Sequence, residues 1–69
     1  MIGYLIAAEP ESVRTITGAF TSVGAQTIQP YACILPWSGT AEQLGGHLRL
    51  ILPEAKLVIC EISGGWRLQ

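Results

Sequence analysis

Apolar residues run almost unbroken through residues 2–8 and 56–62. Runs of this length that contain Ile, Leu and Val are typical of buried strands. Residues 26–35 also favour a strand, but Pro30 interrupts them and cannot donate a hydrogen bond to a strand ladder. We therefore expect a short edge strand before Pro30 and a central strand that ends near Pro36.

The segment from Pro10 to Gly24 has the spacing of an amphipathic helix. Its apolar residues form one helical stripe: Val13, Ile16, Phe20 and Val23. Proline suits the first helical turn because it has no N–H to satisfy, and glycine suits a left-handed cap. Gly18, inside this helix, costs about 1 kcal/mol relative to alanine, and it predicts a close approach to a strand.

A second helix is predicted from Thr40 to a stop at Pro53. Thr40 precedes Gln43 by three residues, which is the spacing of a capping box. Gly45 and Gly46 weaken this helix by roughly 1–2 kcal/mol in propensity. Its apolar stripe consists of Ala41, Leu44, Leu48 and Ile51.

The resulting order is strand, helix, strand, strand, helix, strand. This order folds most simply as an α+β domain, the ferredoxin-like βαββαβ plait, with an antiparallel sheet and two helices on one face. The chain has 69 residues, which predicts a single domain over residues 1–69.

Both faces of the predicted sheet are rich in apolar side chains. In the last strand Val58 and Cys60 point to one side, and Leu57 and Ile59 point to the other. Two helices cover only one face, and a large uncovered apolar face marks an interaction site. Self-association as a two-fold dimer is the economical explanation. The alternative is that the segment carrying Trp66 folds back over the sheet.

The composition agrees with a surface that is buried against another chain. Hydrophobic residues make up 49% of the chain and charged residues 13%, about half the usual ~25%. This excludes intrinsic disorder, and a net charge of −1 gives no positive field for nucleic acid or acidic membranes. The apolar segment 2–8 is too short to span a membrane and lacks the basic start of a signal peptide. We expect a cytoplasmic, soluble protein without a membrane partner.

Few residues offer thiol or metal chemistry. Cys33 and Cys60 both lie within apolar runs, which predicts buried, reduced thiols rather than a disulfide framework. The single histidine, His47, stands beside the apolar stripe of the second helix and is interpreted as structural. The sequence contains no zinc pattern, phosphate loop or serine elbow, so we expect no cofactor.

Two segments resemble a known group of proteins. Residues 40–44 are similar to the helix-opening segment of SinR-like proteins, and residues 56–64, followed by Trp66 and Arg67, are similar to their final strand and tryptophan-bearing tail. These are small ferredoxin-like relatives of the CRISPR-associated adaptation nuclease and of the VapD-type ribonucleases. The resemblance implies a homodimer packed through its sheets, in a phage-defence, mobile-element or toxin–antitoxin setting. We expect a dimer interface formed by Tyr4, Tyr31, Leu57, Ile59 and Trp66.

The sequence departs from the nuclease relatives at their expected metal ligand. That ligand is an aspartate just past the first strand, where this chain has Ala7 and Ala8, and the chain contains no aspartate. Glu9 is the nearest carboxylate, whereas metal-assisted phosphodiester hydrolysis needs several converging carboxylates. We therefore predict a non-catalytic interaction module. One alternative is a metal-dependent nuclease that uses Glu9 with Mg²⁺ or Mn²⁺, and a second is a small-molecule-sensing plait.

Nucleic acid is a further partner to weigh. A two-fold dimer could set Arg49 and Arg67 beside one groove, and Trp37 and Trp66 could stack on bases. The chain has only four Lys and Arg residues, however, and affinity for nucleic acid grows with the number of phosphates neutralised. Tryptophans are also enriched at protein interfaces. A homodimer, with a possible further protein partner, is therefore the main prediction.

Overall fold

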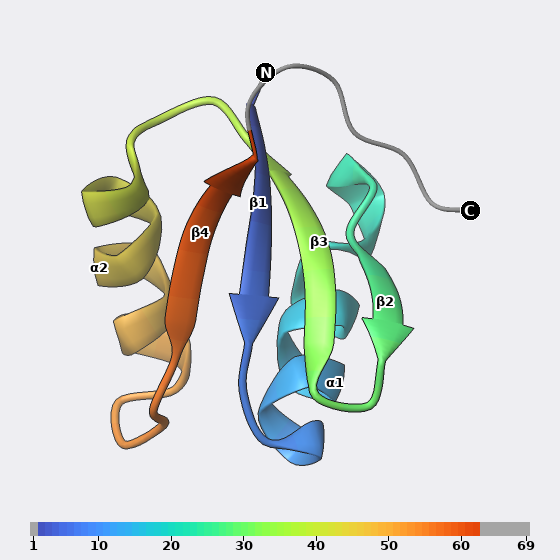
Figure 1. Ribbon diagram of the computed structural model, residues 1–69. Helices are drawn as coiled ribbons and strands as arrows, with labels where there is room; N and C mark the ends of the chain where they lie inside the picture. The colour runs from blue at the N-terminus through green and yellow to red at the C-terminus, as the bar shows by residue number, and fades with distance from the viewer. Residues whose placement is uncertain (1, 63–69) are drawn as a thin grey trace.

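Four strands form one antiparallel sheet in this computed structural model, which describes residues 2–62. The sheet order is β2-β3-β1-β4, and the strands are β1 (Ile2–Ala7), β2 (Gln26–Gln29), β3 (Ala32–Trp37) and β4 (Val58–Ile62). The helices are α1 (Pro10–Ala19), the short 3₁₀ helix η1 (Thr21–Val23) and α2 (Ala41–Ile51). In Figure 1, β1 and β3 form the middle of the sheet, α1 lies behind the strands and α2 stands beside β4. The predicted α+β class and order of elements are confirmed.

The predicted break at Pro30 separates β2 from β3. β2 is an edge strand and β3 a central one, as expected. The pairing of β2 with β3 shifts register between Thr27 and Gln29. Proline has no N–H for a ladder, so the chain turns at Pro30 instead of extending β2.

The capping box of α2 is formed as predicted. The Oγ1 atom of Thr40 accepts a hydrogen bond from the backbone N–H of Gln43 at 3.1 Å. In return, the Oε1 atom of Gln43 accepts one from the backbone N–H of Thr40 at 2.9 Å. These bonds satisfy two of the N–H groups that have no partner within the helix. The last helical residue is Ile51, just before the predicted stop at Pro53.

The first helix is shorter than its apolar stripe suggests. α1 ends at Ala19, and the hydroxyl of Thr21 donates to the carbonyl oxygen of Thr17 at 2.6 Å. Such side-chain bonds compete with the helical backbone pattern. Gly24 then adopts a left-handed conformation with φ of 98°, but it caps η1 rather than α1. In the described part of the chain, no helix is long and apolar enough to cross a membrane.

The close approach predicted at Gly18 is not found. A Cβ atom added at Gly18 would meet nothing within 4 Å, other than the helix's own nearby backbone. The residue therefore lies in α1 without a packing requirement for glycine. Its contribution is the lower helix propensity of glycine, which favours the early end of α1.

Both helices bury their apolar stripes against the same side of the sheet, here called the helix face. Tyr4 and Ile6 of β1 pack there with Val13 of α1 and Leu44 of α2. Burying one Leu or Ile side chain completely stabilises a fold by about 1.5–3 kcal/mol, so this face holds the core. Its buried residues are Tyr4, Ile6, Val13, Ile16, Phe20, Ala25, Cys33, Leu35, Leu44 and Leu48.

Candidate functional site

The sheet surface opposite the helices, here called the open sheet face, is apolar. In its middle row Leu5 lies between Ile34 of β3 and Cys60 of β4. In β1, β3 and β4 the antiparallel register and the alternation of side chains place these residues on the face: Gly3, Leu5, Ala7, Ala32, Ile34, Pro36, Val58, Cys60 and Ile62. At the β2 edge the uncharged Gln26, which is paired with Ile34, lies on the same face. None of them is charged, so these side chains offer no ion pair to a partner.

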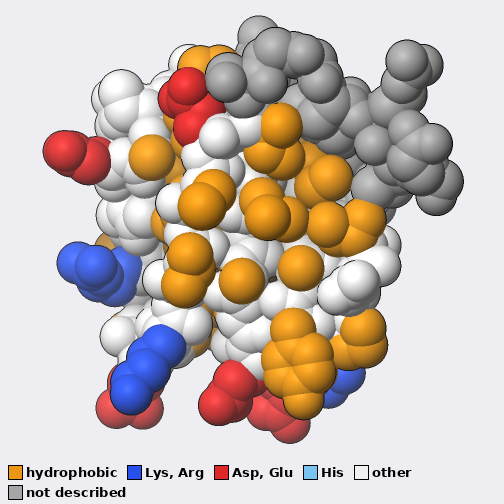
Figure 2. Space-filling view, in the orientation of Figure 1, with side chains coloured by type: hydrophobic (Ala, Val, Ile, Leu, Met, Phe, Trp, Pro, Cys, Tyr) orange, Lys and Arg blue, Asp and Glu red, His pale blue; other side chains and the backbone are white. Residues whose placement is uncertain are grey.

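Part of the open sheet face is accessible to solvent. Val58 is 61% exposed and Cys60 is exposed, whereas Ile34 at the centre is only 6% exposed. Figure 2 looks onto this face and shows hydrophobic side chains gathered over the strands, with acidic and basic side chains around the margin. A contiguous apolar surface on a small protein is typical of an interaction site.

Three of the predicted interface residues lie on the helix face instead. Tyr4 is fully buried, and its hydroxyl donates a 2.8 Å hydrogen bond to the carbonyl oxygen of Gly39. Leu57 and Ile59 are partly buried and pack against the core. Because the helices cover these side chains, a dimer that packs through the uncovered side of the sheet would use residues such as Val58 in their place.

Of the other two predicted interface residues, one is exposed and one lies outside the described part of the chain. Tyr31 lies in the turn between β2 and β3 with 63% of its side chain exposed. Its carbonyl oxygen accepts a 2.9 Å hydrogen bond from the backbone N–H of Ala8, which fixes the turn beside the end of β1. Tyr31 is therefore available to a partner. Trp66 lies outside the described residues, as does Arg67.

Glu9 occupies the N-cap position of α1. Its backbone is extended, its carbonyl oxygen accepts the first helical hydrogen bond from Val13, and its exposed side chain makes no capping bond. Together with Glu11 in the first turn, it places negative charge near the positive end of the helix dipole. Within residues 2–62 no group of three or more His, Cys, Asp or Glu residues could hold a metal ion.

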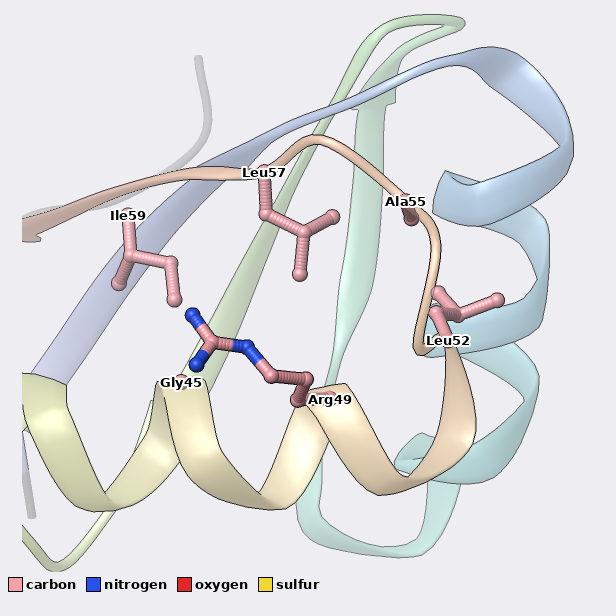
Figure 3. A pocket seen from close by; sticks show the side chains of 6 residues that line it. All are labelled: Gly45, Arg49, Leu52, Ala55, Leu57 and Ile59. Carbon is pink, nitrogen blue, oxygen red and sulfur yellow. The ribbon is translucent and has the colours of Figure 1, made fainter.

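Arg49 lines a pocket between α2 and β4. The pocket has a volume of about 100 Å³, and its lining residues are Gly45, Arg49, Leu52, Ala55, Leu57 and Ile59. Figure 3 shows the Arg49 side chain rising from α2 toward Ile59. The structure thus brings together Arg49, Leu57 and Ile59, which the sequence suggested for two different roles.

The other residues of this pocket, Gly45, Leu52 and Ala55, were not predicted from the sequence. Gly45, Arg49 and Leu52 are four and then three positions apart, which is the spacing of one helix face. Leu57 and Ile59 alternate on one side of the following strand segment. Combining these two spacings was the signal that could have predicted a shared pocket.

His47 packs in an aromatic cluster. Its ring centroid lies 5.7 Å from that of Phe20 and 5.6 Å from that of Trp37. The rings of Phe20 and Trp37 are arranged edge to face, with centroids 6.3 Å apart. The cluster joins the end of β3 to the end of α1 and to α2, which supports the structural interpretation of His47 and gives Trp37 a packing role in the same cluster.

The two cysteines have opposite environments. Cys33 is fully buried on the helix face, and this burial raises its pKa above the usual value. The thiol of Cys33 is therefore protonated and unreactive near neutral pH. The prediction that Cys60 is buried is wrong, because this residue lies exposed on the open sheet face.

Comparison of the chain with protein-family models, with curated proteins and with solved structures finds no match.

Proposed function

We propose that this protein is a ferredoxin-like plait that acts as a non-catalytic, homodimeric interaction module. The order of strands read from the β4 edge is β4-β1-β3-β2, and all neighbouring strands are antiparallel. In this arrangement β3 lies between β1 and β2, which are joined by α1, so that the first strand–helix–strand unit is split. This topology supports the plait.

The uncharged open sheet face carries the proposal of a dimer. A surface without charge selects a partner that also lacks charge at the contact, because burying an unpaired charge is costly. A second copy of this chain offers such a surface, and a two-fold axis would bring like residues together. Burial of the exposed Val58 and its neighbours would then supply the driving force.

The resemblance to SinR-like proteins suggests the setting of this module. It favours a cytoplasmic protein in a phage-defence, mobile-element or toxin–antitoxin system, with a further protein partner. Nucleic-acid binding through Arg49 and Arg67 and nuclease activity through Glu9 are the weaker alternatives. For Glu9, the carboxyl group stands without two further ligands in the described part of the chain.

Sedimentation equilibrium over a range of micromolar concentrations tests the dimer. We expect a monomer–dimer equilibrium in the wild type and at least about tenfold weaker association in Val58→Lys, which places a charge on the open sheet face. Val58 is 61% exposed, so this substitution leaves the monomer fold intact. Leu50→Lys is the matched control, because Leu50 is 82% exposed on α2 and away from the strands. A wild type that stays monomeric overturns the proposal.

Thiol labelling provides a second test on the same face. Cys60 is exposed in the isolated chain, and sheet packing would cover it. We expect its labelling by a maleimide to slow as protein concentration rises, and to remain constant in Val58→Lys. Labelling that is independent of concentration in both proteins contradicts packing through this face.

A further inference from the structure

The pocket between α2 and β4 combines one charged group with an apolar lining. Leu52 and Ala55 come from the end of α2 and the connection to β4, and Leu57 and Ile59 come from the segment that enters and forms β4. Figure 3 shows the side chains of Leu57 and Arg49 approaching the same space from opposite sides. The pocket lies on the helix side of β4 and shares no residue with the open sheet face.

Arg49 gives the pocket its chemical character. Among the described residues that line it, this guanidinium is the single charged group, and the others are apolar or glycine. The apolar side chains around it offer no acceptors for its N–H donors, which point in a fixed fork geometry that matches a carboxylate. An anionic group that enters this pocket would therefore find a charged partner without a competing carboxylate in the lining.

Gly45 keeps space open beside the guanidinium. It lies within α2, where glycine costs about 1 kcal/mol relative to alanine. A Cβ atom at this position would lie 3.6 Å from the Cδ1 atom of Ile59, an ordinary contact distance. The position could therefore accept a side chain without a clash, but that side chain would narrow the pocket. At Gly46, the next residue, an added Cβ atom would meet nothing within 4 Å, apart from nearby backbone of α2.

We propose that this pocket binds small carboxylates that carry a short apolar chain. The carboxylate would pair with the Arg49 guanidinium, and the chain would contact Leu52, Leu57 and Ile59. An apolar cavity of about 150 Å³ holds benzene, so the volume of about 100 Å³ suits a chain of roughly four or five carbons. The lining offers no carboxylate for an ammonium group, so the ligand class is an organic acid without an α-amino group rather than a free amino acid.

Titration with isocaproate, followed by NMR of the backbone amides, tests the site. We expect saturable shifts at Gly45, Leu57 and Ile59, and at least about tenfold weaker binding of isohexanol, which lacks the charge, and of acetate, which lacks the chain. Arg49→Gln should weaken isocaproate binding at least about tenfold. Arg49→Lys should bind isocaproate more tightly than Arg49→Gln but less tightly than the wild type, because lysine keeps the positive charge without the fork of donors. Equal affinity of wild type and Arg49→Gln overturns the proposal, as do shifts confined to the open sheet face.

A pair of glycine variants separates pocket filling from changes in helix stability. Gly45→Leu places a side chain in the pocket, whereas Gly46→Leu gains similar helix propensity where the surroundings are open. We expect Gly45→Leu to abolish saturable isocaproate binding and Gly46→Leu to bind like the wild type. If the two variants bind isocaproate equally, the ligand does not occupy this pocket.

Discussion

The hydroxyl of Tyr4 donates a 2.8 Å hydrogen bond to the carbonyl oxygen of Gly39, a residue 35 positions later in the chain. Tyr4 lies in the middle of the sheet, and Gly39 lies in the loop that leads from β3 into α2. The bond therefore fixes the start of α2 relative to β1. It also holds the Tyr4 side chain on the helix face.

We expect Tyr4→Phe to lower the free energy of unfolding by about 0.5–1.5 kcal/mol, because the substitution removes this bond and leaves its acceptor without the phenol. Urea denaturation measures the change. Tyr31→Phe is the control, since Tyr31 is 63% exposed, and it should unfold like the wild type. Equal stability of all three proteins would show that the Tyr4 bond adds nothing to the fold.

Thr40→Ala should destabilise the protein by about 1 kcal/mol, since it removes the side-chain acceptor of the α2 capping box. The same denaturation experiment measures this loss. Thr15→Ala is matched to it, because the Thr15 hydroxyl only donates to the carbonyl oxygen of Glu11 on the exposed side of α1. A larger effect at Thr15 than at Thr40 would contradict the assignment of the cap.

The alternation of side chains along the strands could be predicted from the sequence. Which side of the sheet the helices cover could not. In β1, Tyr4 and Ile6 on one side and Leu5 and Ala7 on the other are all suited to burial, so the pattern does not choose between them. The choice depends on where the helices pack. That placement involves contacts such as Tyr4 with Gly39, which short-range sequence patterns do not specify.

The pocket is a second feature that sequence patterns describe only in part. The helical spacing of Gly45 and Arg49 is visible in the sequence, as is the alternation of Leu57 and Ile59. The path of the connection from Leu52 to Leu57 decides whether these two sets meet. Its turn contains a backbone hydrogen bond of 3.3 Å from the N–H of Ala55 to the carbonyl oxygen of Leu52, which no motif predicts.

Stability should fall in alkaline solution. Burial raises the pKa of Cys33 above its usual 9.0, and burial, together with the negative charge of Glu61, raises the pKa of Tyr4 above its usual 10.0. The folded state then binds these protons more tightly than the unfolded state. The stability that this tighter proton binding adds to the folded state is fully present below the usual pKa values. It is lost as pH rises through the raised pKa values. Denaturation at a series of pH values above about 9 measures the decline.

Variants identify the groups responsible for this alkaline decline. Tyr4→Phe and Cys33→Ala should each flatten the dependence of unfolding free energy on pH, whatever their stability at neutral pH. Cys60→Ala removes an exposed thiol and serves as the control for the loss of a cysteine side chain. An unchanged slope in both core variants would mean that other groups cause the decline.

Glu9→Gln tests whether the Glu9 carboxylate acts through the dipole of α1 or as a metal ligand. We expect a small loss of stability at low ionic strength, about 0.3–1 kcal/mol, because the charge interacts favourably with the N-terminus of α1. Millimolar Mg²⁺ or Mn²⁺ should leave the melting temperature of the wild type and of Glu9→Gln unchanged. Metal-dependent stabilisation, or cleavage of labelled RNA that is lost in Glu9→Gln, would instead favour the nuclease alternative.

The two edge strands of the sheet, β2 and β4, differ in how readily they can pair with a strand of another chain. At β2 the register shift between Thr27 and Gln29, followed by Pro30, disfavours the addition of another strand. At β4, Val58–Ile62 contains neither device. Fibre growth by strand addition requires that both edge strands of every molecule can pair with another strand. With only one such edge, strand addition stops once two copies have joined, so the β2 edge limits the growth of this apolar sheet into fibres.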